Sequence, residues 1–218
     1  MKDKKKEFKV LSPMIPDDLD ELCLTGLSIE DEDSFSMSIV SDCNIENQTA
    51  EQVRFKQTIF RKVDFVDVSF EGIDLSNVIF ENCDLSNTDF NGAIIHRVEF
   101  INCKIMGMNL SEASLQNVLL DSCLGGYASF MFSYLKQIKF KNCILTNVDF
   151  RDSKFDKVVF VDTNLQEASM SGTKLKGIDL SECEIEGMKV RAEDIYGVVA
   201  SPVQAIYFSK LLGVVVVI

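Results

Sequence analysis

The chain has 218 residues, 46% of them hydrophobic, and a formal net charge of −12. This length and apolar content allow one or two domains with a full core and exclude wholesale disorder. The acidic balance argues against direct binding of nucleic acid, because contact with a phosphate backbone needs clustered basic side chains. No run of about 18 apolar residues is present, so we expect no membrane span.

The N-terminal region is predicted to be a tail and capping segment over residues 1–34. Its charged first residues are not followed by the apolar stretch of a secretory signal peptide. The chain also contains seven Cys, an odd number that indicates free thiols rather than a disulfide framework. Both features predict a cytoplasmic protein.

Residues 35–197 repeat with a period of five, and 13 of the 16 Phe lie at residue numbers divisible by five. The residue two positions earlier is small or β-branched, and Asn or Gly often stands two positions later, where a tight turn needs unusual backbone angles. A period of five fits neither an α-helix nor a simple strand. It fits a chain that turns a corner every five residues, with two side chains inward and three outward. Four such sides would close a square turn of twenty residues, and about eight turns would stack with β-like hydrogen bonds.

The cysteines support this four-sided closure, because all seven are separated by multiples of twenty: Cys23, Cys43, Cys83, Cys103, Cys123, Cys143 and Cys183. Each falls at the small inward position of the same side, which predicts one buried column of thiols. Free Cys behaves as a small hydrophobe in protein cores. Ligands of a metal would converge on a point and there is no C-x-x-C motif, so we expect no metal and no cofactor.

Two outward features leave alternatives open. An apolar strip at twenty-residue spacing is either a partner surface or a set of side chains that suit a β-ladder, and it comprises Ile39, Ile59, Ile79, Leu119 and Val159. Four large residues near the inward Gly125 mark either a local irregularity or a contact patch, and they are Tyr127, Met131, Phe132 and Tyr134.

Residues 198–218 are predicted to form a helix and a strand. Ser201 is the N-cap, Pro202 the first helical residue, and Gln204 completes a capping box. The helix should end near Gly213, before a short valine strand that reaches Ile218. This end is more apolar than a monomer cap requires, which favours a twofold dimer over the alternative of a simple cap. The predicted interface residues are Tyr207, Phe208, Leu211, Leu212, Val214 and Val216.

Quintets such as Cys83-Asp84-Leu85-Ser86-Asn87 resemble those of the pentapeptide-repeat family. The stretch 201–216 is similar to the terminal module of Qnr-type quinolone-resistance proteins, and the unbroken register resembles their loop-less members from Gram-positive bacteria. The resemblance implies an all-β, right-handed quadrilateral β-helix that forms an end-to-end homodimer. It also implies a DNA mimic that binds DNA gyrase and topoisomerase IV and protects them from quinolones.

Charge along the sequence is acidic toward both ends and mildly positive over residues 101–160. A C-terminal dimer would double one acidic cluster into a surface that could face a topoisomerase. Its members are Asp179, Glu182, Glu184, Glu186, Glu193 and Asp194. Alternatively, these acids only keep the rod soluble, and the protein is a non-catalytic interaction module for an unrelated partner. Enzymatic activity is not expected, because the single His has no evident nucleophile to activate.

Overall fold

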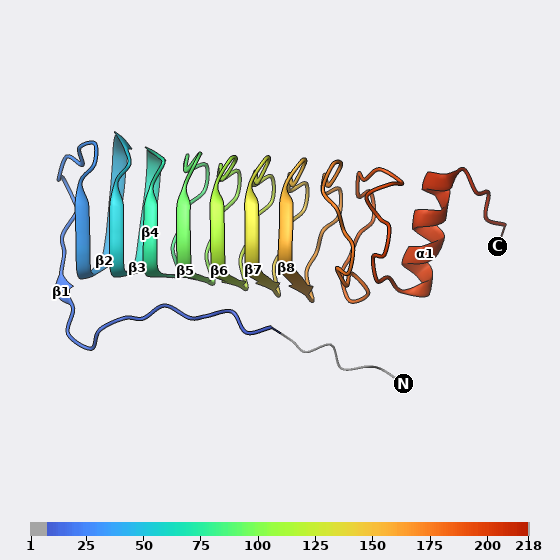
Figure 1. The fold of residues 1–218 in the computed structure, drawn as a ribbon. Helices are drawn as coiled ribbons and strands as arrows, with labels where there is room; N and C mark the ends of the chain where they lie inside the picture. The colour runs from blue at the N-terminus through green and yellow to red at the C-terminus, as the bar shows by residue number, and fades with distance from the viewer. Residues whose placement is uncertain (1–7, 218) are drawn as a thin grey trace.

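The structure of the protein is a computed structural model that describes residues 8–217. Within these residues the chain forms a parallel β-solenoid that ends in one short helix (Figure 1). A single parallel sheet contains the strands in sequence order: β1 (Asp20–Glu21), β2 (Ser34–Glu51), β3 (Arg54–Glu71), β4 (Asp74–Glu81), β5 (Ile94–Ile101), β6 (Ser114–Asp121), β7 (Tyr134–Lys141) and β8 (Lys154–Val161). Helix α1 spans Pro202–Ser209 and continues as a 3₁₀ turn, Lys210–Leu212.

From β2 onward, each strand residue pairs with the residue twenty positions later. Phe60 is the partner of Phe80, and Phe80 is the partner of Phe100. Isolated bridges outside the strands keep this offset as far as the pair Asp179 and Val199. The register confirms the twenty-residue turn that the spacing of Phe and Cys predicted, and with it the β-helix that the resemblance implied.

The corners recur every five residues, where the backbone adopts a positive φ. Asn82 and Asn102 have φ values of 56° and 54°, in the left-handed region that Asn tolerates better than most residues. Tyr127 and Phe132 occupy the same position at 61° and 58°. This backbone conformation is strained for bulky aromatic residues, so local backbone preference does not explain why Tyr127 and Phe132 stand at these corners.

Stacked rings form much of the core. The rings of Phe60 and Phe80 lie 4.8 Å apart at 6°, and those of Phe80 and Phe100 lie 4.9 Å apart at 2°. Leu120 follows in the same column, before Phe140 stacks on Phe160. Most inward positions predicted from the period of five are therefore buried, with Phe35 and Phe155 half-buried, and apolar residues meet similar residues one turn away.

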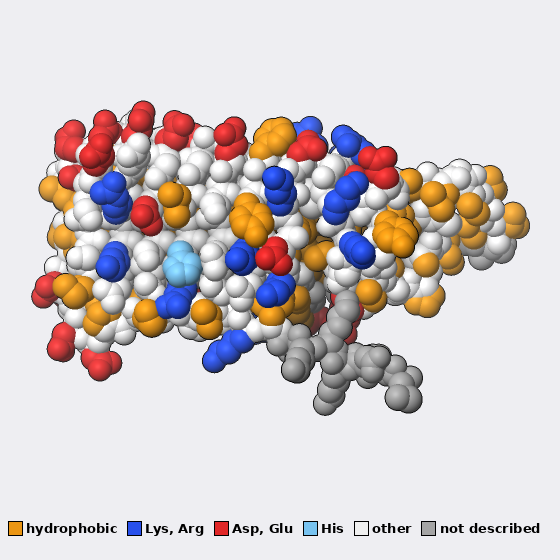
Figure 2. All heavy atoms as spheres, viewed as in Figure 1, with side chains coloured by type: hydrophobic (Ala, Val, Ile, Leu, Met, Phe, Trp, Pro, Cys, Tyr) orange, Lys and Arg blue, Asp and Glu red, His pale blue; other side chains and the backbone are white. Residues whose placement is uncertain are grey.

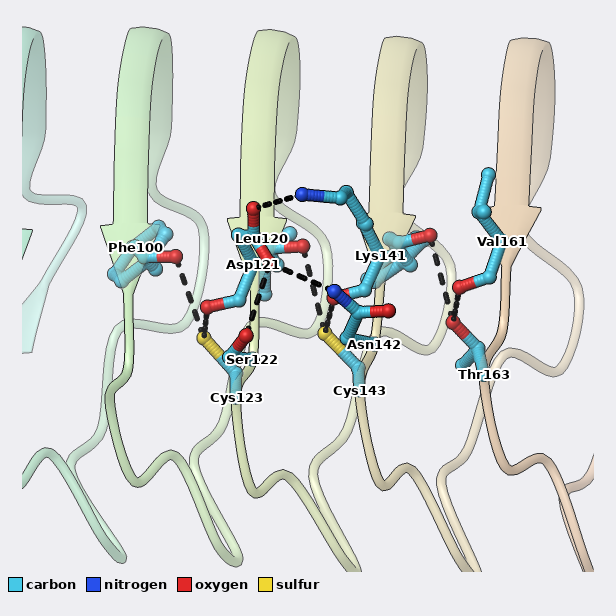
Figure 3. Close-up of polar contacts among 11 residues, drawn as sticks. Phe100, Leu120, Asp121, Ser122, Cys123, Lys141, Asn142, Cys143, Val161 and Thr163 are labelled. Atoms are coloured by element: carbon cyan, nitrogen blue, oxygen red, sulfur yellow. Dashed lines mark hydrogen bonds and ion pairs between the residues drawn. The ribbon is translucent and has the colours of Figure 1, made fainter.

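The cysteine column is structural (Figure 3). The Sγ of Cys123 donates to Phe100 O at 3.4 Å, and in the same column the hydroxyl of Thr163 donates to Phe140 O at 3.4 Å. Thr163 replaces Cys with the same bonding pattern, and Val63 occupies the column with no donor at all, so the column requires a small buried side chain rather than a thiol. Cys43 is in the column but only half-buried, and the prediction was wrong for Cys23, which is exposed. β1 pairs with β2 at an offset of eighteen, which moves that thiol out of the column.

Gly125 marks no irregularity in the coil. A Cβ at this position would lie 2.7 Å from Leu145 Cδ2 and 2.9 Å from Ile105 Cγ1, so the adjacent turns fill its space. Bridges from Lys104 to Leu124 and from Leu124 to Ile144 continue the regular pairing through it. The nearby aromatic side chains are therefore not explained by a broken turn.

Residues 8–19, the N-terminal strap, run along the solenoid axis across successive turns (Figure 1). The N–H of Leu11 donates to Asn117 Oδ1 at 3.3 Å, and the N–H of Met14 donates to Asn77 Oδ1 at 3.0 Å. Phe8 shares a groove with Leu119, a member of the apolar strip. All five residues of that strip are half-buried, so only part of each side chain is accessible.

Candidate binding surfaces

Helix α1 caps the C-terminal end of the solenoid. The Ser201 hydroxyl accepts the Gln204 N–H and Gln204 Oε1 accepts the Ser201 N–H, which confirms the predicted capping box. The Gln204 amide also donates to the carbonyls of Leu180 and Cys183 at 2.7 and 2.8 Å. The Tyr207 hydroxyl donates to Met188 O at 2.9 Å. The helix therefore satisfies backbone groups that a bare solenoid end would expose.

Two predictions for this end were wrong. Phe208 is only 5% exposed and packs into the core, so it is not available to a second copy. Residues 214–217 form no strand, because a strand needs a paired neighbour and α1 covers the last turn; Ile218 lies outside the described residues. Tyr207 and Val216 are half-buried. Leu211, Leu212 and Val214 remain exposed, by 37%, 68% and 49%.

The predicted acidic cluster does not form one surface. Asp179 precedes a corner and Glu182 lies at it, Glu184 and Glu186 lie on the next side, and Glu193 follows two further corners. All five are exposed. Because the chain changes direction every five residues, acids that are close in sequence point in different directions.

Asp194 is buried, so its prediction as a partner-facing residue was wrong. Its carboxylate accepts the Gly172 N–H and the Lys174 ammonium, both at 2.8 Å. Burial alone would raise the pKa of Asp194, but the hydrogen bonds from Lys174 and Gly172 and the charge of Arg191 hold this pKa below its usual value. These two hydrogen bonds of the Asp194 carboxylate link the final turn of the solenoid to the preceding turn.

When outward residues are grouped by side, a different acidic surface emerges. We call it the acidic side, and it comprises the outward residues of 44–47, 64–67, 84–87, 104–107, 124–127, 144–147, 164–167 and 184–187. Its carboxylates are Glu46, Asp64, Asp67, Asp84, Glu167, Glu184 and Glu186. Its one basic residue, Lys104, pairs with Asp84 at 3.0 Å.

The centre of the acidic side is apolar. Leu124 and Ile144 are bridged on neighbouring turns and are 41% and 47% exposed. Met106 and Tyr127 extend this patch. Sequence reasoning named only Tyr127 of this patch and missed its other members, although the twenty-residue spacing of Leu124 and Ile144 was a signal. An exposed apolar patch between two acidic groups is typical of a docking surface.

A groove lies at the C-terminal end of the acidic side, between α1 and the last turns. Ile185, Val203 and Tyr207 supply its apolar wall, and Glu184 and Glu186 line it as well. This chemistry fits the aliphatic stem and charged head of a basic side chain.

Among the described residues, the buried Cys183 fits the needs of neither a metal centre nor a reactive thiol. Within 8–217 no group of three or more His, Cys, Asp or Glu side chains is arranged to hold a metal ion. Burial raises the pKa of the Cys183 thiol to about 11, which keeps it protonated at neutral pH. In the same range no helix is long and apolar enough to cross a membrane.

Comparison with known proteins identifies the repeat. A family described as "Pentapeptide repeat region" matches residues 73–145, and one described as "Pentapeptide repeats (8 copies)" matches residues 41–77 and 143–181. An uncharacterized protein of Bacillus subtilis (strain 168), YisX, is 38% identical over 131 residues. That match covers 60% of this chain and 61% of the length of the relative.

Solved structures that match this chain have low sequence identity and low TM-scores. One of them is HetL, a pentapeptide repeat protein involved in heterocyst differentiation regulation from the cyanobacterium Nostoc sp. strain PCC 7120. HetL is 17% identical to this chain with a TM-score of 0.33, and the match covers 76% of this chain and 88% of HetL. Trypsin-treated QnrB1, a plasmid-mediated fluoroquinolone resistance protein, is 16% identical with a TM-score of 0.37. That match covers 90% of this chain and 96% of QnrB1. With the repeat matched over residues 41–181 and the twenty-residue register observed, this chain belongs to the pentapeptide-repeat family.

Proposed function

We propose that this protein is a non-catalytic binding protein whose acidic side docks on the DNA-binding surface of a type II topoisomerase. The partner is DNA gyrase or topoisomerase IV, and the binding protects that enzyme from quinolones. The observation that carries the proposal is the acidic side itself, where carboxylates flank an exposed apolar centre on one side of a rod. The similarity of residues 201–216 to the terminal module of Qnr-type proteins adds support.

The charge density argues for a mixed interface rather than for mimicry by charge alone. Duplex DNA carries one charge per about 1.7 Å, whereas Asp64 and Asp84 lie on adjacent turns, about 4.8 Å apart. A surface of this density competes with DNA by adding apolar contacts at Leu124, Tyr127 and Ile144 to complementary potential.

Supercoiling by purified DNA gyrase in the presence of ciprofloxacin tests this function. We expect added protein to restore supercoiling, and the double variant Glu184→Lys with Glu186→Lys to need about a tenfold higher concentration, equivalent to about 1.4 kcal/mol. The matched control, Glu112→Lys with Asp152→Lys, changes net charge equally on another side and should behave as the unmodified protein. The proposal fails if the unmodified protein neither rescues nor inhibits supercoiling.

Two copies of the chain would pair end to end through the apolar C-terminus, where Leu212 and Val214 are exposed. We expect the variant Leu212→Glu with Val214→Glu to be monomeric by light scattering, because four carboxylates would then meet in one interface. Ile94→Glu, 56% exposed on a side of the solenoid, should leave the dimer intact. A monomeric unmodified protein would refute the pairing, as would a double variant that still dimerises.

A further inference from the structure

One side of this acidic protein is basic. We call it the basic side, and it comprises the outward residues of 54–57, 74–77, 94–97, 114–117, 134–137, 154–157 and 174–177. Its cations are Arg54, Lys56, Arg97, Lys136, Lys154, Lys157, Lys174 and Lys176. Only Asp74 and Asp156 oppose them within these ranges. Figure 2 views this side, marked by the single His of the chain, and shows Lys and Arg along it while carboxylates gather at its upper border.

Three of the lysines toward the C-terminal end of the basic side form no ion pair with the described residues. Elsewhere, cations such as Arg61 and Lys141 pair with a carboxylate twenty residues away, at 2.8 and 2.7 Å. Among the described residues, Lys136, Lys154 and Lys176 take part in no ion pair. Unpaired charges packed on neighbouring turns repel one another, and an anionic partner relieves that repulsion.

Exposed aromatic rings accompany these lysines. Tyr134 precedes Lys154 by one turn in the same row and is 40% exposed. Tyr196 is 76% exposed and stands twenty residues after Lys176. Phe132 occupies the adjoining corner in the strained left-handed conformation and is 57% exposed. The basic side therefore offers apolar contact as well as charge.

The N-terminal strap, which already lies along one corner of the basic side, shows how an extended segment lies along this solenoid. Its bonded residues, Leu11 and Met14, are three apart, and their partners, Asn117 and Asn77, are two turns apart. Two turns span about 9.6 Å at the strand spacing of about 4.8 Å. Three residues of a polyproline II segment span about 9.3 Å and return to the same face. The strap contains Pro13, whose fixed φ suits that conformation.

Lys136 and Lys176 repeat this two-turn spacing on the same side of the solenoid. They occupy one row two turns apart, with Asp156 on the turn between them. A segment with a carboxylate at every third residue would place successive carboxylates on Lys136 and Lys176 and would pass over Asp156. Its intervening residues would reach the ring of Tyr134.

We propose that the basic side binds an extended acidic segment of another protein, with a carboxylate at every third residue and apolar or proline residues between. Nucleic acid fits less well, because its charges are closer together than the lysines and the bordering carboxylates of Glu112 and Asp152 repel a dense polyanion. This binding uses a different side from the proposed topoisomerase surface, so either can fail without the other.

Fluorescence anisotropy with the full chain tests the proposal, using a labelled peptide of repeating Glu-Pro-Leu as the probe. We expect saturable binding that weakens as salt is raised and falls about tenfold in the variant Lys136→Gln with Lys176→Gln. The matched control, Lys62→Gln with Lys210→Gln, removes two exposed lysines elsewhere and should bind as the unmodified protein. Tyr134→Ser, which copies Ser114 one turn earlier, should also weaken binding.

Two further probes make the result decisive. A peptide of the same composition with its glutamates grouped at one end should bind more weakly, because it loses the two-turn spacing. Equal binding of that peptide would overturn the spacing argument. Tighter binding of oligothymidylate of the same length would overturn the choice of a protein partner, and an unchanged affinity in the Lys136 and Lys176 variant would overturn the assigned surface.

Discussion

Replacing Phe80 by Ala is expected to lower the free energy of unfolding by about 3–5 kcal/mol. The ring is 1% exposed and stacks on Phe60 and Phe100 at 4.8 and 4.9 Å, so its loss leaves a cavity between two turns. In a solenoid each turn contacts only its neighbours, and a cavity at this position weakens both interfaces that hold the turn in the stack. Urea unfolding followed by circular dichroism measures the change.

Two other variants calibrate that result. Phe132→Ala removes a ring that is 57% exposed and should change stability by about 0.5 kcal/mol or less. Phe80→Leu should cost less than Phe80→Ala, because Leu120 already fills the same column between Phe100 and Phe140. If Phe80→Ala were as stable as Phe132→Ala, the ring stack would not be a main source of stability.

Asp194→Ala is expected to destabilise the protein by about 1–3 kcal/mol at neutral pH. The change removes the acceptor for the Gly172 N–H and for Lys174, and it loosens the last turn beneath α1. The neighbouring Glu193→Ala is the matched control, since that side chain is exposed and makes no comparable bond; it should stay within about 0.5 kcal/mol of the unmodified protein.

The effect of Asp194 should also depend on pH. Its pKa is lower in the folded state than in the unfolded chain, where it is about 3.9. The stabilisation is therefore complete above the unfolded pKa and is lost as pH falls through the folded pKa. The difference between the unmodified protein and Asp194→Ala should shrink in acid, and a difference that stayed constant from neutral pH to well below pH 4 would contradict the assignment.

Features that repeat locally were predictable from the sequence. The Phe positions identified the inward rows, the Asn and Gly positions identified the corners, and Ser201-Pro202-x-Gln204 identified the start of α1. Each rests on contacts within a few residues or between a residue and its copy one turn away, so the sequence contains both partners at a known spacing.

Features that depend on the ends of the solenoid were not predictable. Cys23 left the column because β1 pairs at an offset of eighteen, and Phe208 turned inward because α1 caps the final turn. The strap over Asn77 and Asn117 joins residues 63 and 106 positions apart. No periodicity in the sequence encodes such a contact, because it occurs once.

The sequence by itself determined the repeat, the inward rows, the corners and the net charge of −12. Only the tertiary structure decided how that charge is distributed. A sum along the chain gives acidic ends and a positive middle, whereas stacking at twenty-residue intervals sorts the same residues into an acidic side and a basic side. The physical reason is that each corner turns the chain toward a new side after five residues, so neighbours on the surface are neighbours across turns and not along the sequence.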